Sequence, residues 1–208
     1  MLDSTQNLFT ADELSLIGDK NFFPAKQRVT EKVRSTLDEI HSVLKNDLSG
    51  VRLLAPNGFD ISAFQFVKGE HLNHYPYQYL DFPRHFVRTE KFTFRSLFWW
   101  GHHFIFAMIL EGTNLNRYKS NLINNYPQIA DRNICLCLGH SLWEWRYGAG
   151  YTLEMTGNRR TETAAVLTHR PFFKLARFIP ITDSIVSEGG LAEVGRETLN
   201  ALYPVITY

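Results

Sequence analysis

The feature that most constrains the fold of this chain is an uninterrupted apolar run from Phe104 to Leu110. The run is far shorter than the roughly 20 residues that cross a bilayer. It has the length of a β-strand, and its lack of polar alternation predicts a central strand that is buried on both faces. On such a strand Phe104, Phe106 and Met108 share one face, because side chains alternate along a strand. A sheet therefore forms the core of the expected fold.

Further strands are expected on both sides of this run. Large aromatic residues alternate with smaller or polar ones in Phe92–Phe98, as on a half-buried strand. Asn57-Gly58 separates the apolar segment Val51–Ala55 from Phe59, and this pair of residues predicts a β-hairpin. The remaining expected strands are Tyr75–Phe82, Ile134–Leu138, Tyr151–Met155 and Phe172–Ile179.

Helices are expected at both ends of the chain. One apolar stripe, formed by Val29, Val33, Leu37, Ile40, Val43 and Leu44, predicts a helix from about Ala25 to Asn46. Thr10 followed by Glu13 has the spacing of a capping box and predicts a short helix over 11–17. A third helix is expected over 113–125, and a last one from Gly190 to Leu202, ended by Pro204.

This order of elements predicts an α+β fold and not an alternating βαβ fold. We expect residues 1–208 to form a single domain, with a helical N-terminal third (1–50), a β-rich middle (51–180) and a C-terminal helix (185–203). The sheet is expected to be antiparallel or mixed, with about five to seven strands and with the N-terminal and C-terminal helices packed on it.

The charges nearly cancel, since 22 Lys and Arg residues stand against 21 Asp and Glu residues. A net charge of +1 predicts no nucleic-acid partner and no membrane partner. The first residues lack the basic and apolar regions of a secretory signal. Cys135 and Cys137 fall on one face of an expected strand and are interpreted as buried core residues in a reducing compartment. We therefore expect a cytoplasmic protein.

The most unusual stretch runs from residue 66 to 106 and carries five of the eight histidines and two of the four tryptophans. Its motifs are Gly69-Glu70, Pro76-Tyr77, Leu80-Asp81-Phe82-Pro83-Arg84 with Phe86, and Arg95 with Trp99-Trp100-Gly101. This segment resembles an uncharacterised bacterial family of conserved hypothetical proteins. The resemblance covers about the central forty residues and implies no activity.

The same stretch predicts a pocket for a small, anionic ligand. Arg84 and Arg95 can converge if their two segments pair as neighbouring strands, and paired guanidinium groups suit carboxylate or phosphate. The expected lining also contains Tyr77, Tyr79, His71 and Trp100. Trp143 and Trp145 share a face if their segment is a strand, and aromatic rings line many ligand sites. Alternatively, each arginine simply pairs with Asp81 or Glu90.

Two other hypotheses stay open. A metal-dependent enzyme would use His71 and His74 with His102 or His103, and Glu70 or Asp81 would complete a zinc or iron site. A non-catalytic scaffold would use exposed aromatic residues as its interface. No P-loop, dinucleotide-binding or nucleophile-elbow motif is present in the sequence, so no cofactor is predicted. The sequence does not decide whether the chain is an enzyme.

Overall fold

A computed structural model describes residues 8–208 of the chain. The chain divides into two compact units, one ending at Ser35 and one from Thr36 to Tyr208, and each is described by itself. The helices are α1 (Ala11–Gly18), α2 (Phe22–Asp47), α3 (Leu115–Asn124), α4 (Tyr126–Ile129), α5 (Arg160–Leu167), α6 (Ser184–Ser187) and α7 (Leu191–Ile206). The strands are β1 (Gln65–Leu72), β2 (Tyr75–Val87), β3 (Glu90–Trp99), β4 (His103–Glu111), β5 (Cys135–Cys137), β6 (Thr152–Glu154) and β7 (Phe172–Pro180).

The first unit is helical, as its sequence predicts. Thr10 caps α1, because its hydroxyl accepts from the Glu13 backbone N–H while the Glu13 carboxylate accepts from the Thr10 N–H. Asp19 satisfies backbone donors at the start of α2, since its Oδ1 accepts from the backbone N–H of Asn21 at 2.7 Å and of Phe22 at 3.2 Å. The helix α2 begins before Pro24, which occupies its first turn, where a missing N–H costs no hydrogen bond.

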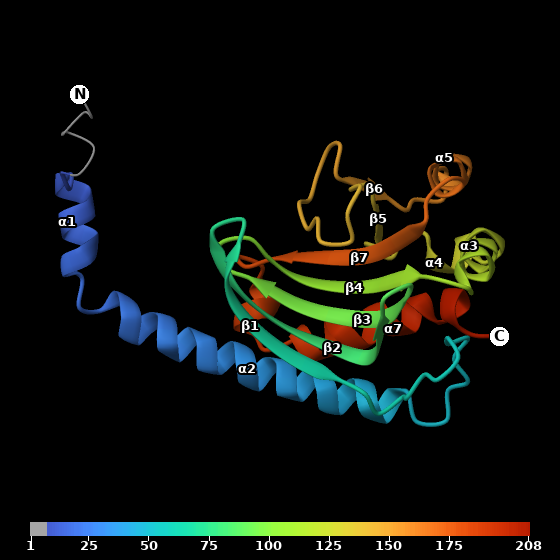
Figure 1. Ribbon diagram of the computed structural model, residues 1–208, viewed down its shortest axis with the longest axis horizontal. Coiled ribbons are helices and arrows are strands. Elements are labelled where there is room, and N and C mark those ends of the chain that lie inside the picture. The colour runs from blue at the N-terminus through green and yellow to red at the C-terminus, as the bar shows by residue number, and fades with distance from the viewer. Residues whose placement is uncertain (1–7) are drawn as a thin grey trace. The chain divides into compact units, whose positions relative to one another are not determined.

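The second unit contains one sheet of seven strands in the order β1-β2-β3-β4-β7-β5-β6 (Figure 1). Every neighbouring pair is antiparallel. The α+β class and the antiparallel sheet are confirmed, and each of the strands β2 to β7 coincides with an expected strand. β4 is the central strand, and its residues from Phe104 to Leu110 are all buried, as the apolar run predicts.

Helices cover one face of this sheet. Phe94, Phe106 and Met108 point to this face, where α7 crosses β4 at Gly195. A Cβ atom at Gly195 would lie 2.9 Å from the Phe106 ring and 3.6 Å from Ile40 of α2, so the helix can approach the strand this closely only because the residue is glycine. The aromatic contacts of His41 with Phe64, Phe66 and Phe82 hold the C-terminal part of α2 on the same face.

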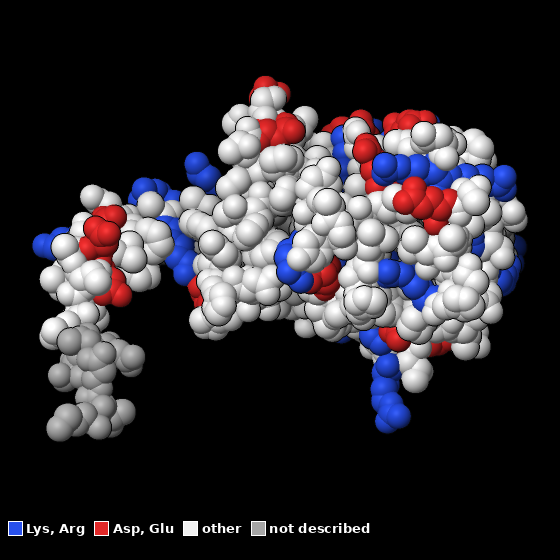
Figure 2. Space-filling model, turned by 90° about the horizontal axis from the view of Figure 1, so that it is seen from above, with Lys and Arg blue, Asp and Glu red and all other residues white. Residues whose placement is uncertain are grey.

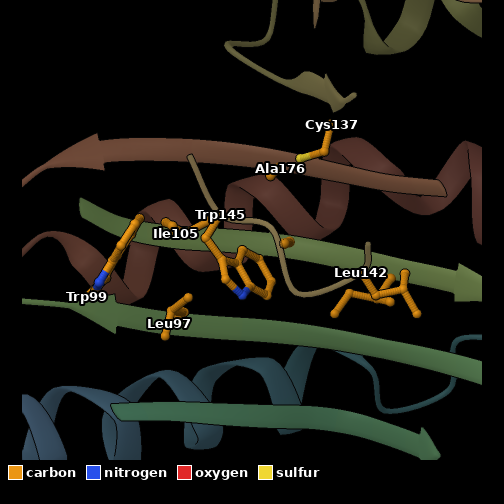
Figure 3. Packing of buried hydrophobic residues seen from close by; sticks show 9 residues of the cluster. Leu97, Trp99, Ile105, Cys137, Leu142, Trp145 and Ala176 are labelled. Carbon is orange, nitrogen blue, oxygen red and sulfur yellow. The ribbon is translucent and has the colours of Figure 1, made fainter. Parts of the chain in front are cut away.

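A segment without regular structure covers the opposite face. Leu142 and Trp145 belong to the segment between β5 and β6, and both are buried in a cluster with Leu97, Trp99 and Ile105 of the sheet. Figure 3 shows both side chains lying over β3 and β4, while Cys137 of β5 lies near Ala176 of β7. The core of the second unit therefore has two layers, one on each side of β4.

The expected hairpin at Asn57-Gly58 is wrong. A turn forms there, since Phe59 donates to the Pro56 carbonyl at 3.2 Å, but the flanking segments do not pair with each other. Leu53 instead forms an isolated bridge with Thr207 at the C-terminus. A tertiary partner thus replaces the local one. The β1–β2 hairpin, which the sequence analysis missed, turns at Asn73 and His74, and both have positive φ.

The expected end of the last helix at Pro204 is also wrong, because α7 continues through Pro204 to Ile206. Side chains of the α3 region satisfy the carbonyl groups at this end of the helix. Asn125 donates to the Pro204 carbonyl at 3.0 Å, and Asn121 donates to the Val205 carbonyl at 3.1 Å. Within residues 8–208, no helix has both the length and the apolar character that crossing a membrane requires.

Candidate functional site

The candidate site is an aromatic cavity of about 310 Å³ on the face of the sheet that lacks helices. Its walls come from β1, β2, β3 and the β5–β6 segment. The lining residues are Leu72, Tyr77, Tyr79, Arg95, Leu97, Trp143 and Trp145. Tyr77 and Tyr79 stand side by side on β2 with nearly parallel rings, 6.1 Å between centroids. Three of the residues expected at the site, Tyr77, Tyr79 and Arg95, therefore do lie together.

Arg95 forms the polar wall of the cavity, and its guanidinium group is held in one orientation. Its Nε and Nη2 donate to the two carboxylate oxygens of Asp81, each at 2.7 Å. The side chains are 5% and 2% exposed, so this is a buried bidentate ion pair. The guanidinium carbon lies 3.7 Å from the centroid of the Tyr79 ring, and Trp143 and Trp145 lie within 5.2 and 5.6 Å. Much of the Arg95 charge is already balanced by Asp81.

Arg84 lies on the same face of the sheet as Arg95. It pairs with Thr93 in the β2–β3 register, two positions from Arg95 on β3, and residues related in this way are diagonal neighbours. Its guanidinium group lies over the Phe86 ring at 5.4 Å, and that ring stacks on Trp143 at 6.0 Å. The Nε atom of Arg84 is buried and has no hydrogen-bond partner among the described residues. Arg84 thus lies next to the cavity lining without belonging to it, and its buried Nε is unpaired within residues 8–208.

Two cations from the region of β7 hold the β5–β6 segment over the sheet. Lys174 is 2% exposed and donates to the carbonyls of Leu142, at 3.0 Å, and Glu144. Its Nζ also lies 3.6 Å from the centroid of the Trp145 ring. Burial lowers the pKa of Lys174 to about 8, since desolvation penalises the ammonium form. Arg170 donates to the carbonyls of residues 137–139.

The segment that carries Trp143 and Trp145 is not a strand, so the condition under which the two rings would share a face is not met. Trp145 is buried and Trp143 is 49% exposed, so the two rings do not have the same environment. The carbonyls of the segment accept from Lys174 and Arg170 instead of from a neighbouring strand. Both rings nevertheless line the cavity. Sequence analysis did not identify Leu72, Leu97 or Lys174, because only the tertiary fold brings them to this place.

Three of the expected ligand-binding residues, Arg84, His71 and Trp100, lie outside the cavity lining. His71 is exposed on β1, two positions before the turn of the β1–β2 hairpin. Trp100 follows β3 and makes an edge contact with Phe98, 5.8 Å between centroids. Phe98 is directed to the opposite face of the sheet from Leu97, because neighbouring strand residues alternate.

The four histidines of the metal hypothesis have separate surroundings. His71 and His74 are exposed near the hairpin turn, whereas His102 stacks on Trp99 with 3.8 Å between ring centroids. His103 contacts Tyr147 and Phe178, and burial lowers its pKa. In the part of the chain that is described, no three His, Cys, Asp or Glu side chains are grouped so that they could hold a metal ion.

The fold and this cavity define the class of the protein: an α+β protein with one antiparallel sheet, helices on one face and an aromatic cavity on the other. The chain matches no protein-family model, no curated protein and no solved structure. The geometry of the site is therefore the basis for assigning a function.

Proposed function

We propose that this protein binds a small, planar, anionic molecule in the aromatic cavity. The observation that carries the proposal is the convergence of four aromatic rings with Arg95, and with Arg84 beside them, on one face of the sheet. Aromatic walls with a few fixed polar groups are typical of small-molecule sites. A volume of 310 Å³ equals that of roughly ten liquid waters, so the ligand is a metabolite of about that many non-hydrogen atoms.

The ring of the ligand and its charge would be recognised by different residues. Tyr77, Tyr79 and Trp143 line the cavity with rigid aromatic rings, against which a planar ligand gains contact without ordering flexible chains. Arg95 is already paired with Asp81, whereas the buried Nε of Arg84 is unpaired. We therefore assign the anionic group of the ligand to the half-buried guanidinium group of Arg84, on the same face of the sheet, whose planar fork of donors suits a carboxylate.

We also propose that the protein is cytoplasmic and that it binds neither membranes nor nucleic acid. Cys135 and Cys137 are both buried free thiols, which suits a reducing compartment. In the second unit, acidic and basic residues are interspersed over the surface drawn in Figure 2, which favours a small ligand over a polyanion.

Benzoate and its uncharged analogue benzamide test this proposal by thermal shift and by quenching of tryptophan fluorescence. A ligand at about 100 times its dissociation constant stabilises the folded state by about 2.7 kcal/mol, which such a shift detects. We expect benzoate to stabilise the wild type more than benzamide does. Arg84→Gln should abolish this preference, and Trp143→Ala should weaken the binding of both compounds.

Arg88→Gln is the matched control, because Arg88 is an exposed arginine beyond the end of β2. It should respond to benzoate as the wild type does. If neither compound shifts the wild type, or if Arg84→Gln keeps the preference for benzoate, the cavity does not bind the proposed class of ligand.

A further inference from the structure

The N-terminal arm, residues 8–35, exposes an unusual amount of apolar surface. Within residues 8–23, seven large apolar side chains are between 41% and 74% exposed: Leu8, Phe9, Leu14, Leu16, Ile17, Phe22 and Phe23. The helix α1 buries none of its residues. Single exposed apolar residues are ordinary, but a contiguous group of this size marks an interaction surface.

Five of these seven side chains belong to formed helices, and Leu8 and Phe9 lie just before α1. The capping box of Thr10 and Glu13 fixes the start of α1, and Asp19 fixes the start of α2. Leu14 and Ile17 are three residues apart and therefore lie on one side of α1. Seven such side chains expose roughly 700 Å² in all, close to the 800 Å² or so that each partner buries in a standard protein interface.

The charges of the arm change sign along its length. Residues 8–19 contain three acidic residues and no basic residue, whereas residues 20–35 contain five basic residues and one acidic residue. Figure 2 shows both signs on this part of the molecule, at the left of the view, with uncharged surface between them. Two such arms placed side by side in opposite directions bring the acidic half of each against the basic half of the other.

We propose that the arm binds the arm of a second copy of this chain, antiparallel and about a twofold axis. In such an isologous contact the same patch serves both partners, so an arm with complementary halves satisfies both ends at once. A negatively charged lipid surface is a poorer partner, because the apolar helix α1 carries acidic residues and no basic residue. The proposal does not depend on the function assigned to the cavity.

The antiparallel alignment places the junction between the two halves near the twofold axis. This junction lies at Lys20 and Asn21. A cysteine at position 21 would therefore meet its counterpart in the second copy. The native thiols Cys135 and Cys137 are buried and do not compete in mild oxidation.

Light scattering after size-exclusion chromatography tests the proposal on the full-length protein. We expect a mass of twice 24.1 kDa at high concentration and dissociation on dilution. Leu14→Lys/Ile17→Lys should weaken self-association by roughly a hundredfold or more, since each change places a cation in the apolar contact, opposite the basic half of the other arm. Ile61→Lys/Val87→Lys is the matched control, because these side chains are 42% and 47% exposed in the second unit, and it should stay dimeric.

Cross-linking supplies a second measurement that does not depend on weakening the contact. Asn21→Cys should form a disulfide-linked dimer under mild oxidation, whereas Ser120→Cys, an exposed position on α3, should not. Far-UV circular dichroism checks that each variant is folded. The proposal is overturned if the wild type stays at 24.1 kDa at all concentrations, or if its dimer survives Leu14→Lys/Ile17→Lys. It is also overturned if the cysteine at position 21 forms no cross-link.

Discussion

Replacing Lys174 by methionine tests how the cover of the candidate site is held. The lysine is buried, and burial lowers its pKa to about 8 from the 10.5 of an exposed lysine. Between these two pH values the unfolded chain binds a proton at this residue and the folded chain does not. The free energy of unfolding contributed by Lys174 therefore rises with pH in this window, by about 1.4 kcal/mol per pH unit and by about 3 kcal/mol in total.

The measurement is urea unfolding of the wild type and of Lys174→Met at pH 7, 8 and 9, followed by circular dichroism. We expect the free energy of unfolding of the wild type, relative to that of the variant, to increase by about 1 kcal/mol between pH 8 and pH 9. Below pH 8 this difference should be nearly constant, because Lys174 is then protonated in both states. Other groups that titrate, such as the Cys137 thiol, are present in both proteins.

Lys68→Met is the matched control, since Lys68 lies on β1 with an exposed side chain. This variant measures the effect of losing an exposed lysine, and the change with pH seen for Lys174→Met should exceed the change seen for it. A flat difference between the wild type and Lys174→Met from pH 7 to pH 9 would refute the reasoning. It would show that the ammonium group is not desolvated and that the β5–β6 segment is held in another way.

Three further predictions concern the core. Asp81→Asn should destabilise the protein by about 3–5 kcal/mol in chemical denaturation, because it leaves the Arg95 charge buried without its partner; a loss below about 1 kcal/mol would mean that water reaches the pair. Phe106→Ala should cost about 3–5 kcal/mol in the same assay, since the ring is 1% exposed beneath α7, and a small loss would contradict the central position of β4. Cys135 and Cys137 should not react with a thiol reagent until the protein is unfolded, because burial raises both pKa values, that of Cys135 to about 12; rapid reaction in the native state would show that this strand is open to solvent.

The parts of the fold that the sequence predicts well are those in which local pattern and tertiary environment agree. The apolar run of β4 and the aromatic alternation of β3 describe strands that are buried in the same way in the structure. The stripe of α2 likewise predicts its helix, and Leu37, Ile40 and Leu44 are fully buried. In these elements the spacing of the apolar residues in the sequence matches the residue repeat of the helix or strand that they form.

The failures occur where distant partners replace local ones. Pro204 ends a helix in isolation, but amide groups of Asn121 and Asn125, about 80 residues earlier, satisfy carbonyls at this helix end. Asn57-Gly58 forms its turn, but Leu53 pairs with Thr207. No local pattern contains these partners.

The candidate site was predictable only in part, for the same reason. Tyr77, Tyr79 and Arg95 belong to two neighbouring strands, so the alternation of side chains places them on one face. The cover of the cavity comes from a segment whose conformation depends on Lys174 and Arg170, which lie about 30 residues further along the chain. The sequence left open whether Arg95 pairs with Asp81, and in the structure the two side chains form an ion pair.

The different covers of the two sheet faces have a consequence for how the molecule opens. The helices on one face are packed along their length, whereas the irregular β5–β6 segment is held by the buried side chains of Leu142 and Trp145 and by a few of its carbonyl groups. Such a segment can lift in a local fluctuation that leaves the helical face closed. Amide hydrogens of residues 138–150 should therefore exchange with solvent faster than those of β3 and β4. Opening of the cavity is then separate from unfolding and costs less free energy. It occurs many times within the lifetime of one folded molecule, so ligands can enter and leave without unfolding the protein.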